Sequence, residues 1–460
     1  MDFWTLALRR RLPIVIWLAF FFGIQLTHLH DYSPNPIARI SSTFALTEGQ
    51  LNIDRYAGKT HDWSFPPDHH YYSNKPPGPS LLAVPFYFPV DLWLTRGVAT
   101  REARDKVRFD HVRMTQAWLS FALQMVPFAV VMIIALGRLE AAGASARAVD
   151  LACVCALLGN TAAIYMNTYF GHGLTAWVVI AVFLALDANA AVWAGFFFGL
   201  AILCDYTMVI LAPACAWMFW ERVRDRPVAA AARVAIGGLG PLIVFMTYHA
   251  ACFGGPFVLA NKFVAPEFID AAASKNLGGI FYPVPNLSVL RQLLFGYRQG
   301  ILWTQPWVLL AVFVAPAWAG RNGVFEQKLA RFGVPTIVVH LLLISAFNGW
   351  HGGWTAGPRY LCPTFPLLAL LLASTYDRMP LALRVATVVS AFAGATFAIV
   401  AIVVDIIPPL RYVRGSPVWP YYLSQIKDMD SAGQLALLAW MGALVFVWIA
   451  RPDAKKTERN

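Results

Sequence analysis

The chain has 460 residues, of which 58% are hydrophobic and only 13% are charged, whereas soluble domains carry about 25% charged residues. A single water-soluble core cannot cover so much apolar surface, so the composition excludes an ordinary soluble protein and predicts a polytopic membrane protein. The net charge of +11 fits basic residues that orient membrane helices from the cytoplasmic side. Because the sequence has no Lys/Arg run interleaved with aromatic residues, nucleic acid is not an expected partner.

Apolar runs dominate the sequence from its first residues onward. A run must have roughly 20 residues to cross about 30 Å of hydrocarbon. We predict an all-α fold, a single integral-membrane domain over 1–460, and about twelve spans. They lie near 11–29, 114–136, 148–166, 172–187, 190–204, 206–220, 234–252, 300–318, 333–348, 361–375, 384–404 and 434–450.

The stretch 79–95 is apolar, but prolines and Asp91 interrupt it. An interfacial or re-entrant helix is therefore predicted there in place of a full span. With that choice, the basic residues of the short loops gather on the cytoplasmic side, together with both termini and the tail 451–460. Residues 29–112 then form a long first outer loop, and residues 253–299 form a second.

The six cysteines, mostly within or beside apolar segments, have no metal-binding spacing with histidine. They are expected to be small buried side chains without a structural disulfide. The N-terminal apolar run follows a basic start, is long for a signal peptide and has no small-x-small cleavage site. It is therefore expected to be an uncleaved first span.

This topology places several polar segments on one outer face. They are the first outer loop, the turn NTYFGH (167–172), Asp205, the loop 253–299 and the segment WHGGWTAGPRY (350–360). Their convergence indicates that the outer face carries the functional site.

Three of these segments resemble bacterial membrane glycosyltransferases of the GT-C superfamily, of the protein mannosyltransferase and aminoarabinose transferase type. The first contains an N-x-x-x-R pattern (Asn35 and Arg39), LxID (51–54), HDW with Asp62, and YYSNKPPG (71–78). The second is TYFGH, which ends at His172, and the third is GGWTAGPRYLCPTFPLL (352–368). The resemblance spans most of the chain and implies a location in the bacterial inner membrane, among membrane lipids.

The resemblance also implies an activity. A sugar is transferred at the outer face, with inversion, from a polyprenyl-phosphate carrier to an acceptor, which is a lipid, a glycan or a protein. An acid of the first outer loop acts as base or as ligand to a divalent metal ion. Many members carry an acidic pair shortly before the arginine, where this chain has Asn35-Pro36. The candidate catalytic acids are therefore Asp62 and, behind it, Asp31, Glu48 and Asp54.

Displacement of a lipid phosphate from a sugar carbon needs a base for the acceptor hydroxyl and cations for the leaving phosphate. Arg39, Lys75 and Arg359 are the candidate phosphate-binding residues. Lys75 precedes Pro76-Pro77-Gly78, which stiffens the backbone at a helix start, and the Arg359 guanidinium suits a phosphate bidentately. Binding of lipid headgroups is the alternative role for both Lys75 and Arg359.

Four further residues are candidates to line the site: Tyr72, His172, His351 and Tyr360. Asp68, His69 and His70 suggest a cation site, although adjacent residues rarely point at one metal. The apolar residues that follow Asp62 are expected to desolvate its carboxylate and to raise its pKa.

Two other functions fit the same composition. A lipid or sugar-lipid transporter or flippase would show internal repeats and charges within its spans, whereas here the polar residues gather at one face. A non-catalytic partner subunit of the same fold is favoured by the missing acidic pair before Arg39.

Overall fold

The computed structural model describes residues 3–30, 33–223, 227–264, 281–319, 323–353, 355–408 and 417–449. Most of these residues are helical, and the only named strands among them form one short hairpin. Asp31, a candidate acid, and the predicted cytoplasmic tail lie outside the described residues.

The first half of the chain contains one helix before the predicted outer loop, several short elements within it, and a helical body after it. These elements are α1 (Phe3–Thr27), α2 (Pro34–Thr47), η1 (Asp54–Lys59), β1 (Trp63–Ser64), β2 (Tyr72–Ser73), α3 (Gly78–Leu94), α4 (Arg101–Asp110), α5 (Val112–Ser120), η2 (Phe121–Met125), α6 (Val126–Ala141), α7 (Ala146–Cys153), η3 (Val154–Leu158), α8 (Thr161–Met166), α9 (Gly171–Asp187), α10 (Ala191–Cys204), η4 (Tyr206–Ile210) and α11 (Leu211–Val223).

The second half begins with a long helix and continues with several short ones before three further long helices. These elements are α12 (Pro227–Phe253), η5 (Ala260–Phe263), α13 (Leu287–Phe295), α14 (Ile301–Thr304), α15 (Trp307–Phe313), α16 (Ala315–Ala319), α17 (Val324–Ser345), η8 (Cys362–Thr364), α18 (Phe365–Tyr376), α19 (Leu381–Val404), α21 (Val418–Asp428) and α22 (Ser431–Ile449).

Five helices of the described residues are long and apolar enough to cross a membrane: Val112–Ala141, Val228–Phe253, Val324–Ser345, Leu381–Val404 and Ser431–Ile449. They agree with five of the predicted spans. Other predicted spans coincide with shorter apolar helices or with chains of helices, so the number of about twelve stays a prediction. The interrupted stretch 79–95 forms the continuous helix α3, with Pro85 and Pro89 inside it.

The predicted span 148–166 is broken, and its sequence explains where. After η3 the chain turns at Gly159, and the Asn160 side chain then accepts a hydrogen bond of 3.1 Å from the backbone N–H of Ala163. Asparagine favours this N-cap role because its side-chain oxygen replaces a missing backbone acceptor. A new helix, α8, therefore starts where an uninterrupted apolar run had been predicted.

Helices α10 and α12 pack through small residues. A Cβ added at Gly195 would lie 2.0 Å from the Val234 carbonyl oxygen, and one added at Gly237 would lie 1.8 Å from the Val192 carbonyl oxygen. Only glycine permits this approach of two backbones, the usual solution for helix pairs that cannot rely on a hydrophobic driving force in lipid. Five of the six cysteines are buried, as the sequence predicted.

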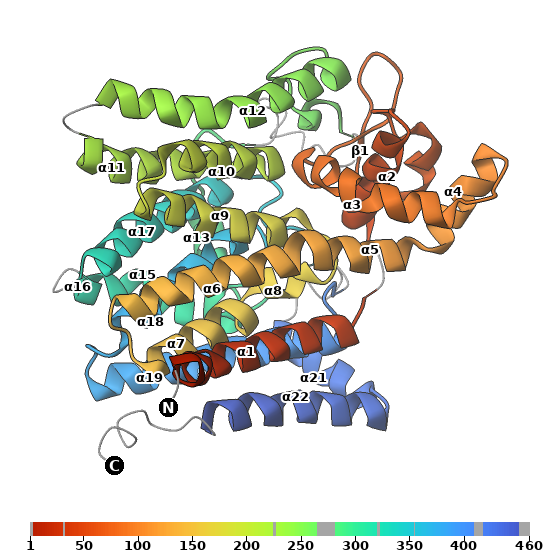
Figure 1. Ribbon diagram of the computed structural model, residues 1–460. Coiled ribbons are helices and arrows are strands. Elements are labelled where there is room, and N and C mark those ends of the chain that lie inside the picture. The colour runs from red at the N-terminus through yellow and green to blue at the C-terminus, as the bar shows by residue number, and fades with distance from the viewer. Residues whose placement is uncertain are drawn as a thin grey trace.

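The outer-loop elements α2, α3, α4 and the β hairpin lie together at one end of the helical body (Figure 1). Helix α1 begins and α22 ends toward the opposite end (Figure 1). The side of the membrane on which the two termini lie stays a prediction.

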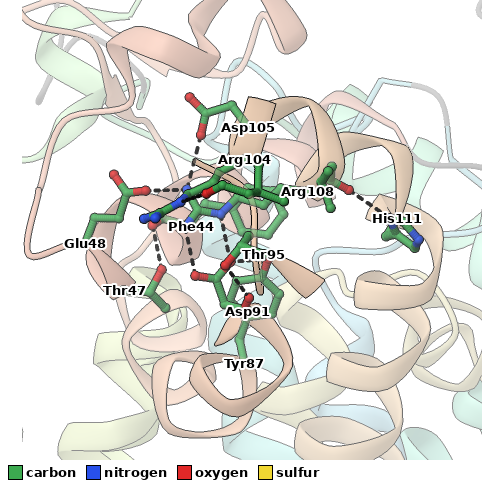
Figure 2. A network of polar contacts seen from close by, with 12 residues as sticks. Phe44, Thr47, Glu48, Tyr87, Asp91, Thr95, Arg104, Asp105, Arg108 and His111 are labelled. Carbon is green, nitrogen blue, oxygen red and sulfur yellow. Dashed lines mark hydrogen bonds and ion pairs between the residues drawn. The ribbon is translucent and has the colours of Figure 1, made fainter. Parts of the chain in front are cut away.

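A buried ion-pair network, which we call the arginine clamp, holds α4 against α2 and α3 (Figure 2). Its centre is Arg108, which is 2% exposed. Arg108 Nε and Nη2 donate to the two carboxylate oxygens of Asp91 at 2.7 and 2.8 Å, and Nη1 donates to Glu48 and Asp105. Arg55 and Arg101 add further ion pairs to Glu48.

Burial alone would lower the pKa of Arg108, but its hydrogen bonds to Asp91 and Glu48 raise it. Burial likewise opposes ionisation of Glu48, yet Arg108 and Arg101 hold the pKa of that carboxyl below its usual range. Arg108 and Glu48 are therefore both charged at neutral pH. The clamp fixes the end of α2, the helix that carries Arg39, and the end of α3, the helix that follows Lys75.

Replacing Arg108 with Met should lower the free energy of unfolding by about 3–5 kcal/mol, because it leaves Asp91 buried without its cation and removes one of the cations of Glu48. Denaturant unfolding in detergent measures the loss. The matched control is Arg101→Met: its side chain is half exposed, so its loss should stay below about 1 kcal/mol. Equal losses for the two variants would contradict a clamp centred on Arg108.

Candidate functional site

The β hairpin places Asp62 beside Lys75. Strands β1 and β2 are antiparallel, with Ser64 opposite Tyr72. The pairing continues beyond the strands, because the Asn74 backbone N–H donates to the Asp62 carbonyl oxygen at 3.3 Å. Thirteen residues apart in sequence, Asp62 and Lys75 therefore meet at the base of the hairpin, where Lys75 Nζ lies 3.0 Å from Asp62 Oδ1.

The segment after Lys75 is fixed against the body of the molecule. A Cβ added at Gly78 would lie 2.7 Å from both the Leu203 carbonyl oxygen and Cys204 Sγ. Glycine is thus required where α3 begins against the end of α10. This contact brings the Lys75 segment next to Asp205, the residue that ends α10.

Arg39 is buried on α2. Its Nε donates to Asn35 Oδ1 at 3.3 Å, and its Nη1 donates to the Pro76 carbonyl oxygen at 3.5 Å. The N-x-x-x-R spacing places Asn35 and Arg39 on one face of the helix. The guanidinium lies against Gly171, where an added Cβ would be 2.9 Å from Nη2.

Arg359 is held by aromatic rings. Its guanidinium carbon lies 5.2 Å from the Phe170 ring centre and 5.1 Å from that of Tyr360, and Nη2 donates to the Tyr360 hydroxyl at 3.4 Å. Its Nε is buried and has no hydrogen-bond partner in the described part of the chain. Such stacking orients a guanidinium while leaving its N–H donors available.

Arg39, Lys75 and Arg359 surround one carboxylate. Burial alone would raise the pKa of Asp62, but Lys75, and after it Arg359 and Arg39, lower it below its usual value. The prediction that desolvation raises the pKa of Asp62 is therefore wrong, because Lys75, Arg359 and Arg39 together outweigh burial. Burial also lowers the pKa of Lys75, Asp62 opposes this effect, and Arg39 adds to it.

A second carboxylate reaches the same cluster from α10. Asp205 Oδ2 lies 3.4 Å from His172 Nδ1, while Oδ1 accepts hydrogen bonds from the backbone and hydroxyl of Thr207 at 3.0 and 2.7 Å. Asp205 also interacts electrostatically with Arg39. His172 is thus a basic residue within ion-pair distance of Asp205.

The turn before His172 is strained. Tyr169 adopts a positive φ of 58°, which is uncommon for a bulky residue. Its hydroxyl donates to the Pro79 carbonyl oxygen at 2.8 Å, so the turn is tied to α3. This anchor keeps Phe170 under Arg359 and Gly171 against Arg39.

The structure separates the remaining candidates. Glu48 belongs to the arginine clamp. Asp54 is exposed and accepts hydrogen bonds from His70 Nδ1 at 2.7 Å and from the Tyr71 N–H at 2.6 Å. Neither acid appears among the groups that act on Lys75 or Arg359.

Among the candidates to line the site, Tyr360 and His172 are in place, with ring centres 5.6 Å apart. Tyr72 lies in a separate cluster with Phe253 and donates to Asp68 at 2.8 Å. His351 is partly buried, and its Nδ1 accepts from the Gly353 N–H at 2.9 Å. Sequence reasoning missed Tyr169, for which the TYFGH motif was the only signal. It also missed the Asp62–Lys75 pair, which only a predicted hairpin between the two residues could have revealed.

Metal binding was left open by the sequence. Among the described residues, no group of three His, Cys, Asp or Glu side chains is arranged to hold a metal ion. Asp68, for example, accepts from the Tyr72 hydroxyl and the His70 backbone N–H. A role for a divalent metal ion stays a prediction.

No protein-family model matches the chain, and no curated protein sequence matches it. Among solved structures, the chain is similar to the crystal structure of an Archaeoglobus fulgidus oligosaccharyltransferase in its apo form, with a TM-score of 0.47 and 12% sequence identity. The match covers 96% of this chain and 60% of that chain, so this chain spans less than two thirds of its length. A likeness this distant leaves the function to be argued from the site.

The ion pair between Asp62 and Lys75 predicts how the titration of Lys75 responds to substitution of Asp62. Asp62→Asn removes the group that most raises the pKa of Lys75 and leaves burial and two arginines, which lower it. Lys75 should then lose its proton at lower pH, so its acylation should begin at lower pH. Acylation followed residue by residue with mass spectrometry measures the shift, with Asp54→Asn as the control. An unchanged profile for Lys75 in Asp62→Asn would contradict the pairing.

Proposed function

We propose that the protein is a membrane glycosyltransferase of the GT-C type. It moves a sugar from a polyprenyl-phosphate carrier to an acceptor at the outer face of the membrane, with inversion. Five helices long and apolar enough to cross a membrane support a membrane location, and α2, α3 and the β hairpin of the first outer loop lie together at one end of the helical body (Figure 1).

The observation that carries this proposal is the convergence of three buried or half-buried cations from separate segments. Arg39 comes from α2, Lys75 from the end of the hairpin and Arg359 from the loop before η8. The carboxylates that act on them are Asp62 and Asp205, so one positive charge is in excess. A preorganised excess of cations outside water is the arrangement that stabilises charge developing on a leaving phosphate.

The same cluster offers a base. Asp62 is ionised at neutral pH because Lys75 lowers its pKa, so its carboxylate is available to accept a proton. The cations also weaken it as a base, and release of Lys75 toward a bound phosphate would restore basicity. We infer that donor binding and base activation are coupled through this one ion pair.

If the cations hold the phosphate, Lys75→Ala and Arg359→Ala should each lower turnover about a hundredfold, on the order of 3 kcal/mol. Transfer of radiolabelled sugar from polyprenyl phosphate by the purified protein measures this. Lys59→Ala and Arg291→Ala are the matched controls, because both side chains are exposed, and they should keep normal turnover. Near-normal rates for the Lys75 and Arg359 variants would instead assign them to lipid headgroups.

Asp62→Asn should be the most damaging substitution among the acids of the first loop, with a loss of at least about a hundredfold. Glu48→Gln and Asp54→Asn should cost less, because both residues have partners away from the cation cluster. Asp31→Asn is tested beside them. If Asp31→Asn is inactive while Asp62→Asn turns over, the base lies before Arg39.

The same assay separates the alternatives. A transporter or flippase would move the labelled carrier across vesicles without transferring its sugar. A non-catalytic partner subunit would bind the carrier and do neither.

A further inference from the structure

Beside the phosphate-binding cations lies a second titratable cluster, formed by His172, Asp205 and His340. His172 Nδ1 is buried and faces Asp205 Oδ2 at 3.4 Å, and 8% of the His172 side chain remains exposed. Because Nδ1 is buried, that exposure belongs to other atoms of the side chain. An imidazole that has one nitrogen near a carboxylate and another part of its side chain accessible can exchange a proton.

His340 on α17 is fully buried and interacts electrostatically with Asp205 and His172. The described residues offer no hydrogen-bond partner to either of its ring nitrogens. A buried polar group left without a partner costs free energy of folding, so packing alone does not account for it. Two imidazoles thus lie beside one buried carboxylate, and His172 Nδ1 and both ring nitrogens of His340 have no hydrogen-bond partner among the described residues.

The proposed reaction releases a proton that a group in the site must accept. A phosphodiester donor carries one negative charge, which matches the single excess positive charge of the cluster. In the transfer, the C1–O bond to the phosphate breaks with its electron pair on the phosphate oxygen, and the acceptor oxygen bonds to C1. The product phosphate carries two negative charges, and the acceptor's proton must go elsewhere.

We propose that His172, held by Asp205 and adjacent to His340, receives that proton and keeps it while the lipid phosphate dianion occupies the cations. This inference rests on the proposed function and adds a proton-holding group to it. Asp62 takes the proton from the acceptor, and the proton ends on the His172 imidazole. The groups that act on His172 are Asp205, Arg359 and Arg39, with the Tyr165 and Tyr360 rings packed around it.

The test is the number of protons taken up when a product analogue binds. Farnesyl phosphate at pH 8 is a dianion, because the second pKa of a phosphate monoester is about 6, and its methyl diester is a monoanion. Calorimetric titrations in buffers of different ionisation enthalpy count the protons. The protein should take up about one proton more with the monoester than with the diester, and His172→Gln should abolish the difference.

His351→Gln is the matched control and should retain the difference, since His351 is not among the groups that act on His172. Asp205→Asn should reduce the difference if the carboxylate stabilises the imidazolium. Binding of the monoester without extra proton uptake, or uptake that survives in His172→Gln and is lost in Asp62→Asn, would overturn the inference alone. Failure of both ligands to bind would overturn the proposed function itself.

Discussion

The ion pair between Asp62 and Lys75 is the interaction on which the site depends. Buried cations repel one another and lose hydration, and a low-dielectric setting tolerates them only when carboxylates lie close. Asp62 is the nearby carboxylate for Lys75, and Asp205 lies near Arg39. Two acids against three cations keep the cluster foldable while leaving charge for a ligand. A third acid would have abolished anion binding, and a single acid would have left the cations too costly to bury.

The positions of the charged side chains are well defined because the backbone segments that carry them are held at several independent places. Gly78 lets α3 begin directly on the end of α10, and the Tyr169 hydroxyl ties the strained turn before His172 to α3. At the far ends of α2 and α3, the arginine clamp fixes their separation (Figure 2). The clamp balances its own charges, so it contributes rigidity without competing for a phosphate.

Apolar length and basic loops are local properties, so the sequence predicted where the helices lie and which polar segments share one end. It also identified Arg39, Lys75 and Arg359 through motifs. What it could not supply were partners set by three-dimensional packing. Glu48 was a candidate base until Arg108, sixty residues later, proved to hold it. The predicted pKa shift of Asp62 had the wrong direction. The apolar neighbours of Asp62 are adjacent in sequence, whereas Lys75 reaches it only across a hairpin.

The lowered pKa of Asp62 changes the mechanism that is expected for the base. A base that is merely desolvated would be strong before any substrate arrives, and it would be protonated for part of the time. A base paired with the proposed phosphate-binding lysine stays ionised but is only weakly basic while the site is empty. When a phosphate draws the Lys75 ammonium away, the carboxylate loses its main stabilising partner and becomes more basic. In the proposed reaction, the carrier lipid would thus activate the base beside it, whereas an acceptor that entered an empty site would meet a carboxylate too weak to deprotonate it.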